Sequence, residues 1–327
     1  MSEGVVLVVG GAGYIGSHMV KALCESGRKV VVLDNLVSGH RDAVAEGATF
    51  VEGEMADREL LGDLFQRNEI TAVMHFGAFI EVGESVRAPG KYYGNNVAAT
   101  LVLLEAMVQH GVRTFIFSST AAVYGEPCYT PIDEAHPCAP INPYGRTKWM
   151  VETILRDYQQ AHDLRSVSLR YFNAAGADPG GSLAERHEPE THLIPIVLEA
   201  AAGRRPHVAV YGRDYPTADG TCVRDYVHVT DLCQAHLLAL RYLEEGGSSA
   251  AFNLGNGGGF SVQEVIDTAR AVTGRAIEVV DGPRRDGDPA VLVADATAAR
   301  DVLGWQPAYA SLEPIVEHAW RALYEDV

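Results

Sequence analysis

Residues 5–16 read Val5-Val6-Leu7-Val8-Val9-Gly10-Gly11-Ala12-Gly13-Tyr14-Ile15-Gly16. The first five residues are a short, continuously apolar run, which is typical of a strand buried on both faces in the middle of a parallel sheet. The glycines that follow permit a tight turn, a close approach of the backbone to a pyrophosphate and close packing of a helix on the strand. The stretch therefore predicts a strand, a phosphate-binding turn and a helix that begins near Tyr14.

A second strand, predicted at residues 29–33, leads into Asp34. At this place after a glycine-rich turn, a carboxylate can accept hydrogen bonds from both ribose hydroxyls of a dinucleotide and repels a 2′-phosphate. The sequence therefore favours NAD over NADP as the cofactor.

Apolar runs and helical patterns keep alternating along the first half of the chain. Further strands are predicted at residues 50–52, 72–75, 114–117 and 166–170, and helices at residues 58–66 and 92–110. This alternation predicts an α/β fold with a Rossmann-type, doubly wound parallel sheet, in which ligands bind beyond the carboxyl ends of the strands. Residues 54–55, 76–78 and 118–120 are expected at those ends.

The composition changes after residue 172 to loops rich in Gly, Pro, His and Asp. We expect residues 1–172 to form the NAD-binding domain and residues 173–327 to form mainly a smaller α/β lobe that binds the substrate. Residues 229–254 read as another helix–strand unit that could return to the main sheet. The arginines that could hold a phosphate-bearing ligand in this part are Arg204, Arg205, Arg224, Arg284 and Arg285.

A further motif, Asn142-Pro143-Tyr144-Gly145-Arg146-Thr147-Lys148, points to acid–base chemistry. Pro143 is predicted to begin a helix, so that Tyr144 and Lys148 lie one turn apart on the same face. A positive charge roughly 5 Å from the phenol, at an effective dielectric of about 20, favours the phenolate by about 3 kcal/mol, or about two pKa units. Tyr144 is therefore a candidate general base. Thr120 is either a hydrogen-bond partner for a substrate hydroxyl or a cap for residues 121–125.

The bulk composition restricts the class of protein. The chain has 327 residues, 47% of them hydrophobic, and a formal net charge of −17, which argues against wholesale binding to nucleic acid or to an anionic membrane. Five cysteines without a C-x-x-C pair predict neither a disulfide framework nor a zinc site, and we expect no metal. Without a basic leader or an apolar stretch near 18 residues, we expect a reducing, cytoplasmic compartment.

Several of these motifs together resemble those of one superfamily. The motifs at residues 10–18, 34–36, 82–85, 144–148 and 170–173 are similar to those of the extended short-chain dehydrogenase/reductases and, within them, of the UDP-glucose 4-epimerase family. That family's substrate-lobe signature resembles Asp214-Tyr215-Pro216-Thr217-Ala218-Asp219-Gly220-Thr221-Cys222-Val223-Arg224-Asp225-Tyr226-Val227-His228-Val229. The resemblance runs from about residue 4 to about residue 324.

The resemblance implies roles for individual residues. Tyr144 would be the base, Lys148 would lower its pKa and hold the nicotinamide ribose, and Thr120 stands where the family usually has Ser or Thr. The residues implied to bind NAD are Gly10, Gly13, Tyr14, Ile15, Gly16, Asp34, Asn35, Ser38, Gly39, Glu54, Met55, Phe76, Gly77, Ala78, Ile80, Asn95, Ser118, Tyr144, Lys148, Tyr171 and Phe172. Those implied to bind the UDP-sugar substrate are Thr120, Tyr144, Asn173, His192, Leu193, Tyr211, Arg224, Arg285, Asp288 and Leu292, with the stretch 285–288 near the diphosphate.

The sequence departs from the better-known bacterial pattern at four places. Ile80 replaces a lysine that contacts the cofactor, and Glu54 replaces an aspartate at the adenine. Residues 191–192, Thr-His, replace an asparagine pair near the diphosphate, and Leu292 stands where an aromatic or a small residue is expected. The donor lost at Ile80 predicts a looser hold on the cofactor without a change in chemistry.

The reaction implied by the resemblance is 4-epimerisation of a UDP-hexose, UDP-galactose to UDP-glucose, through a transient 4-keto intermediate. It would serve galactose metabolism or the supply of UDP-galactose for glycans. Epimerases of UDP-pentoses, UDP-uronates or N-acetylated sugars share the same apparatus and stay open. A 4,6-dehydratase would need carboxylates beside Thr120, where Ala121 and Ala122 stand, and a non-catalytic NAD sensor would not need Tyr144 and Lys148.

The expected partners are a UDP-sugar and a second copy of the chain. The apolar faces of the helices predicted at residues 92–110 and 143–160 suggest a homodimer through paired helices, as in the family. No nucleic acid and no membrane are expected as partners.

Overall fold

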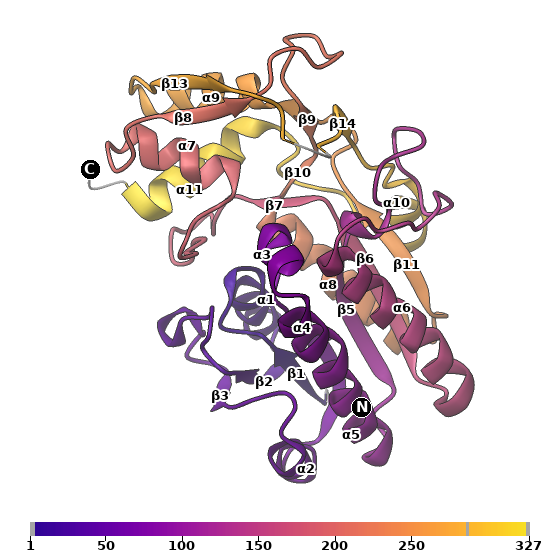
Figure 1. The fold of residues 1–327 in the computed structure, drawn as a ribbon. Coiled ribbons are helices and arrows are strands. Elements are labelled where there is room, and N and C mark those ends of the chain that lie inside the picture. Colours follow the sequence, from indigo (N-terminus) through magenta and orange to yellow (C-terminus); the bar gives the residue numbers. More distant parts are fainter. Residues whose placement is uncertain (1–3, 286–287, 325–327) are drawn as a thin grey trace.

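The fold is built on a seven-stranded parallel sheet. A computed structural model describes residues 4–285 and 288–324, and its strand order is β11-β6-β5-β4-β1-β2-β3, with helices on both sides of the sheet (Figure 1). The strands are β1 Val5–Val9, β2 Lys29–Asp34, β3 Thr49–Glu52, β4 Ile70–His75, β5 Thr114–Thr120, β6 Arg165–Tyr171 and β11 Ala250–Leu254. The predicted doubly wound parallel sheet is therefore confirmed.

Both faces of the sheet are apolar, as the continuous apolar runs predict. Val6 and Val8 of β1 pack under α1 (Tyr14–Glu25) and α8 (Val229–Glu244). Leu7 and Val9 face the opposite core. The helices over that second core are α2 (Arg58–Arg67), α5 (Thr100–Gln109) and α6 (Pro143–His162).

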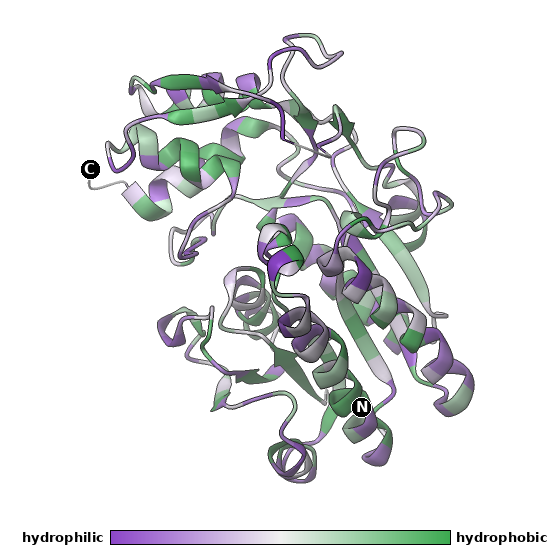
Figure 2. Ribbon diagram, viewed as in Figure 1, coloured by the Kyte–Doolittle hydropathy of each residue, from purple (hydrophilic) through white to green (hydrophobic). Residues whose placement is uncertain are grey.

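Hydropathy follows this layering. The strands at the centre of the sheet are hydrophobic, whereas the helices around them mix hydrophobic and hydrophilic residues (Figure 2). Among the helices of the described residues, none is both long and apolar enough to span a lipid bilayer.

The structure differs from the sequence prediction in β5. The strand was expected to end at residue 117, but it continues to Thr120, because Ser118, Ser119 and Thr120 pair in register with residues 169–171 of β6. Ser118 and Thr120 therefore belong to the carboxyl end of the strand itself.

The single helix expected at residues 92–110 is divided. It consists of α4 (Pro89–Tyr92), a π-helical turn η2 (Tyr93–Ala99) and α5. Within η2, the Asn96 side chain accepts a hydrogen bond from the Phe79 amide (2.9 Å) and donates one to the Phe79 carbonyl (3.0 Å). The wider turn places this amide against the loop after β4, and such π-helical turns are frequent at functional sites.

A smaller lobe follows β6. Its core lies between α7 (Leu193–Ala201), α9 (Val262–Thr273) and α11 (Leu312–Tyr324), and β8 (Val208–Tyr211) pairs with β13 (Val279–Gly282) (Figure 1). A second small sheet has the order β12 (Phe260–Ser261), β9 (Val223–Arg224), β14 (Val291–Leu292). The remaining elements are η1 (Arg41–Ala43), α3 (Val82–Arg87), η3 (Ala121–Val123), β7 (Asn173–Ala175), β10 (Tyr226–His228) and α10 (Thr297–Leu303).

The chain returns to the main sheet between these lobe segments, because β11 pairs in parallel with β6. Asp225 joins the crossing segments. Its buried carboxylate accepts hydrogen bonds from the amides of Asn256 (2.7 Å), Gly257 (3.1 Å) and Ala294 (3.1 Å), and its carbonyl accepts the Asn173 amide (3.0 Å). One side chain thereby fixes where the lobe meets the sheet.

Candidate active site

Tyr144 stands in the first turn of α6. The Asn142 side chain caps this helix by accepting the Gly145 amide (2.8 Å), and Pro143 occupies the first helical position. A Cβ at Gly145 would lie 2.4 Å from the Ala122 carbonyl oxygen, so the glycine lets the helix approach η3 closely. This approach brings Tyr144 to the carboxyl end of β5.

Thr120 serves as a cap, which is one of the two roles that the sequence left open. It is the last residue of β5, and its hydroxyl accepts the Ala122 amide (3.2 Å), which caps η3. Its side chain also acts on Tyr144, because it lowers the pKa of the phenol. Thr120 and Tyr144 are therefore brought together at one point of the sheet edge.

Lys148 lies one turn further along α6 and is 2% exposed. Its ammonium donates a hydrogen bond to the Ser118 carbonyl (2.8 Å) and lies 6.0 Å from the centre of the Tyr144 ring. Burial lowers the pKa of Lys148 to about 7, although Glu152 acts in the opposite direction.

The expected lowering of the Tyr144 pKa by Lys148 is wrong for this structure. Burial raises the pKa of Tyr144 to about 12, the Thr120 side chain opposes the rise, and the Glu81 carboxylate adds to it. The simple Coulomb estimate omitted the cost of enclosing a phenolate. With Lys148 as the only nearby cation, the Tyr144 phenol therefore stays protonated at neutral pH. Further positive charge beside the phenol is needed before Tyr144 can act as a base.

The turn between β1 and α1 fits a dinucleotide. Gly10 has a φ of +78°, and a Cβ there would lie 2.5 Å from the Gly77 nitrogen. A Cβ at Gly16 would lie 2.0 Å from the Gly10 carbonyl oxygen, so both positions require glycine. The Tyr14 hydroxyl, at the start of α1, donates a hydrogen bond to the Gly176 carbonyl (2.7 Å). These contacts leave a cradle of bare backbone at the carboxyl edge of the sheet, which suits a pyrophosphate.

Asp34 ends β2 beside this cradle. Its carboxylate accepts the amides of Ala12 (2.9 Å) and Leu36 (2.8 Å), so it is held against the glycine-rich turn. A Cβ at Gly39 would lie 2.9 Å from Asp34 Oδ1, which explains why a glycine follows Ser38 here. A carboxylate at this position fits the ribose hydroxyls of NAD and repels a 2′-phosphate.

The other residues predicted to bind the cofactor lie along the same edge. Asn35 donates a hydrogen bond to Glu54 (3.1 Å), and Asn95 donates one to the Gly77 carbonyl (3.5 Å). Ser118 and Tyr171 share a short hydrogen bond. Met55 is buried after β3, Phe76 and Ala78 are partly buried after β4, Ile80 is 38% exposed, and Ile15 and Phe172 are partly buried.

The residues predicted to bind the substrate form two groups in the lobe. In the first group, Arg224 of β9 forms a short ion pair with Asp288, and Leu292 of β14 lies opposite Arg224 in register. The Arg285 guanidinium lies 4.1 Å from the centre of the Tyr211 ring. Asp286 and Gly287 of the predicted 285–288 stretch lie outside the described residues.

The second group is at the amino end of α7. The His192 ring faces Glu185 and Glu190, and Leu193 packs against the core of the lobe. Asn173, on β7, donates a hydrogen bond from its side chain to the Asp225 carbonyl (3.1 Å). His192 and Arg224 have different ion-pair partners in the structure.

Sequence reasoning missed the buried network behind α6. Glu152 forms an ion pair with Arg170 of β6 (2.5 Å), accepts the Ser119 hydroxyl (2.5 Å), and Arg170 donates to the Tyr124 hydroxyl (2.9 Å). Both charged side chains are about 95% buried. The available signal was spacing, because Glu152 stands one turn after Lys148 on the same face of the helix.

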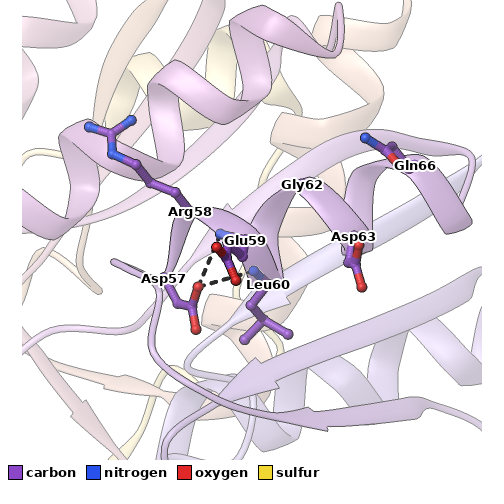
Figure 3. Close-up of a pocket in the computed structure, with 7 residues that line it drawn as sticks. All are labelled: Asp57, Arg58, Glu59, Leu60, Gly62, Asp63 and Gln66. Atoms are coloured by element: carbon purple, nitrogen blue, oxygen red, sulfur yellow. Dashed lines mark hydrogen bonds between the residues drawn. The ribbon is translucent and has the colours of Figure 1, made fainter.

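A pocket on α2 lies outside this site. It is lined by Asp57, Arg58, Glu59, Leu60, Gly62, Asp63 and Gln66 (Figure 3). Asp57 caps the helix by accepting the amides of Glu59 (3.0 Å) and Leu60 (3.1 Å). None of these lining residues is a candidate site residue, and the pocket is the open side of a capped helix end.

Comparisons with known proteins give a consistent result. Residues 6–255 match the model of the NAD dependent epimerase/dehydratase family. The chain is 54% identical over 316 residues to a UDP-glucose 4-epimerase of Halalkalibacterium halodurans, covering 97% of this chain and 94% of that protein.

Solved structures agree at the level of the fold. A crystal structure of a UDP-glucose 4-epimerase has a TM-score of 0.97, 51% identity and 98% coverage of both chains. The UDP-glucose 4-epimerase of Brucella ovis in complex with NAD has a TM-score of 0.95, 49% identity and 97% coverage of both chains.

Proposed function

Because the chain belongs to the NAD dependent epimerase/dehydratase family, we propose that it is an NAD-dependent enzyme that interconverts UDP-galactose and UDP-glucose by inverting C4 of the hexose. The observation that carries this proposal is the placement of Tyr144 and Thr120 together at the edge of a dinucleotide cradle, with Lys148 one turn behind Tyr144 on α6. Similarity to UDP-glucose 4-epimerases over 97% of the chain supports the same reaction.

In this proposal Tyr144 moves the proton of the C4 hydroxyl. Its phenolate oxygen takes that proton, and Thr120 holds the hydroxyl and the phenol in line. NAD, when bound, would supply a reversible hydride acceptor for C4, so that the hexose undergoes inversion without net oxidation. Tyr144 then returns the proton to the C4 oxygen. Because burial raises the pKa of Tyr144, the phenolate forms only where Lys148 and further positive charge act together on it.

The cofactor is held by the chain's own backbone and acids. We assign the pyrophosphate to the glycine cradle at Gly10, Gly13 and Gly16, the adenosine ribose to Asp34, and the adenine side to Asn35 with Glu54. Two facts support these assignments: the cradle excludes side chains at Gly10 and Gly16, and Asp34 is fixed beside it by backbone amides. The other residues predicted to bind NAD lie along the same sheet edge and complete the proposed site.

We assign the UDP moiety to the lobe of residues 173–327. Arg224 and Arg285 supply the positive charge for a diphosphate on an otherwise acidic chain. Arg224 forms an ion pair with Asp288, and Arg285 stacks on the Tyr211 ring. Both contacts support this role, because they orient the guanidiniums before a ligand binds. A firm grip on the nucleotide leaves the 4-keto hexose able to turn, which the reaction requires.

A second candidate function is 4-epimerisation of other UDP-sugars. Leu292 favours a narrow range of substrates, because it is bulkier than Cys or Ser and packs, as Phe172 does, against the small core of Val123, Tyr124 and Ile132 that follows Thr120. The dehydratase alternative is disfavoured by Ala121 and Ala122, which directly follow Thr120 and supply no acid. A sensor without activity would have no use for Tyr144 and Lys148 beside Thr120.

We also propose that the enzyme is a cytoplasmic homodimer. Support for the dimer comes from partly exposed apolar residues on the two neighbouring helices α5 and α6. They are Leu101, Val102, Val108, Met150 and Ile154. The cytoplasmic location rests on the odd number of unpaired cysteines.

The proposed function is tested by conversion of UDP-galactose to UDP-glucose after extensive dialysis, without added NAD, while absorbance at 340 nm is followed. Conversion without accumulation of NADH is the expected result, and it establishes an epimerase that carries its own cofactor. Conversion only with added NAD supports the reaction with a looser cofactor, as Ile80 predicts. If neither hexose, pentose, uronate nor N-acetylated UDP-sugar is converted under either condition, the proposal is wrong.

A further inference from the structure

A cluster of four metal-ligating side chains lies in the loop between β7 and α7. Glu185, His187, Glu190 and His192 each offer one ligand atom, and these atoms all lie within 4.8 Å of one another. The four residues come from one eight-residue stretch, in which His192 immediately precedes α7. The cysteine pattern, from which no zinc site was predicted, does not bear on this cluster because it contains no cysteine.

Four of the separations are close to those of a tetrahedral site, and all of the ligand atoms lie within 4.8 Å of one another. His187 Nδ1 lies 3.0 Å from Glu185 Oε1 and 3.8 Å from Glu190 Oε2. His192 Nδ1 lies 2.9 Å from Glu185 Oε1 and 3.0 Å from Glu190 Oε1. Nitrogen and oxygen ligands about 2.0–2.1 Å from a zinc ion stand about 3.4 Å apart at the corners of a tetrahedron. The observed distances lie on both sides of that value.

The cluster also requires positive charge. The side chains of Glu185 and Glu190 are 5% and 6% exposed, and two carboxylates enclosed together repel each other. In the part of the chain that the structure describes, their ion-pair partners are His187 and His192, while the neighbouring Arg186 pairs with Asp42 outside the cluster. One divalent cation would neutralise both carboxylates and accept both imidazoles in their neutral form.

A second observation points to a ligand. His187 Nδ1 is fully enclosed and hydrogen-bonds to none of the described residues, although it lies 3.0 Å from a Glu185 oxygen. A buried ring nitrogen without a hydrogen bond costs free energy, unless its lone pair has another partner. A metal ion at the centre of the cluster would be that partner.

We propose that Glu185, His187, Glu190 and His192 bind one divalent transition-metal ion, with zinc the best match to two imidazoles and two carboxylates. Four protein ligands leave no open position for water, so the site is structural. The ion ties this loop to the cofactor turn, because the His187 ring meets the Tyr14 ring edge-on, with centroids 6.3 Å apart. It also fixes His192 at the amino end of α7.

The test is a metal count on the whole chain, made without substrate. The protein is dialysed against EDTA, then against buffer with one equivalent of zinc, and its metal content is measured by mass spectrometry. About one zinc per chain is expected, together with a higher melting temperature than that of the EDTA-treated protein. Cobalt(II) in place of zinc should give the intense visible absorption of a tetrahedral site.

Variants separate this cluster from adventitious binding. Glu185→Gln and His187→Gln should each weaken zinc binding at least tenfold and remove the gain in melting temperature. Glu188→Gln, an exposed residue of the same loop, and His207→Gln, an exposed histidine elsewhere, should bind zinc like the parent chain. If a variant does not fold, the zinc titration of the unmutated protein still tests the proposal.

The proposal is overturned if the parent chain takes up no stoichiometric zinc, or if the Glu185 and His187 variants bind it as tightly as the two controls. The four residues would then be a cluster of histidines and carboxylates held together by their own ion pairs. Neither result bears on the proposed epimerase reaction, because the count and the melting temperature do not depend on turnover.

Discussion

Burial of the Tyr144 phenol decides how it can act as a base. Enclosure raises its pKa to about 12, and Thr120 opposes this rise. Removal of the Tyr144 hydroxyl takes away the proton acceptor and changes the side-chain volume only slightly. Tyr144→Phe is therefore expected to lower kcat for UDP-galactose by at least about a hundredfold.

The measurement is kcat by coupled assay, with circular dichroism and a melting curve to show that the variant is folded. Tyr158→Phe, a partly buried tyrosine on the same helix, serves as the matched control and should retain activity. Near-parental turnover by Tyr144→Phe would remove Tyr144 from its proposed role.

A second prediction for a single residue concerns Leu292 and the range of UDP-sugars that the enzyme accepts. Its side chain packs against the small core that contains Val123 and Tyr124, and it is larger than the small residues that would admit an N-acetyl group. We expect good turnover of UDP-galactose and weak or no turnover of UDP-N-acetylgalactosamine. Leu292→Ser should raise the kcat/KM for the acetylated sugar at least tenfold. Comparable efficiency of the parent chain on both sugars would contradict this assignment.

At the scale of elements, α6 is joined to β6 by a buried ion pair. Glu152→Gln would leave the Arg170 guanidinium enclosed without its counter-charge, which costs about 3 kcal/mol or more in the free energy of unfolding. Glu105→Gln, on α5, is the matched control, because its ion pair with Arg58 is exposed and contributes at most about 1 kcal/mol. Urea unfolding of both variants checks the difference. Equal losses would mean that the buried pair contributes no more than a surface pair.

The sequence predicts the elements where the signal is local. The glycine-rich turn after β1, the acid at the end of β2 and the proline that begins α6 each act within a few residues, and the strands and helices around them are confirmed. The extension of β5 depends on pairing with β6, and the π-helical turn at Asn96 depends on a hydrogen bond to Phe79. Contacts between distant segments leave no local pattern.

The same distinction applies to the site. The sequence identified Tyr144 and Lys148 by their spacing, and the structure brings Thr120 to them. The predicted direction of the Tyr144 pKa shift was wrong, because the shift depends on how much protein encloses the phenol. Glu152 was missed for a similar reason, since its partner Arg170 is on another element.

At the scale of the whole molecule, stability should depend on pH. Burial lowers the pKa of His75 to about 3, of His228 to about 3 and of His236 to about 4, from an ordinary value of 6.5. The unfolded chain therefore binds up to three more protons than the folded chain below pH 6.5. The free energy of unfolding should be highest above that pH and fall by at most about 4 kcal/mol per pH unit as the pH drops toward 4.

Urea unfolding at pH values from 7 to 5 measures this slope. His236→Phe keeps the ring that packs on Phe76 and removes one titrating group, so the slope should shrink by about one third. His207→Gln, at an exposed position, should leave the slope unchanged. A stability that does not change between pH 6.5 and pH 5 would show that these histidines do not control acid unfolding.

The proposed homodimer is also a property of the whole molecule. Light scattering should give twice the 35.2 kDa mass of the chain if α5 and α6 pair across a dimer. Met150→Arg, on the exposed side of α6, should shift the protein toward the monomer, whereas Val302→Arg, equally exposed on α10, should not. A parent chain that elutes as a monomer would contradict the proposed dimer.

The return of α8 and β11 to the main sheet has a consequence for how this protein can diversify. The outer strand β11 is paired to β6, although lobe segments both precede and follow it in the chain. A single crossover between two genes, placed after β6 and before β11, would therefore pair one parent's β6 with the other parent's β11. The same crossover would divide the lobe between the two parents. We expect new sugar preferences to arise in such a chain by accumulated point substitutions, and hybrids with an exchanged lobe to survive only where both parents share that sheet edge.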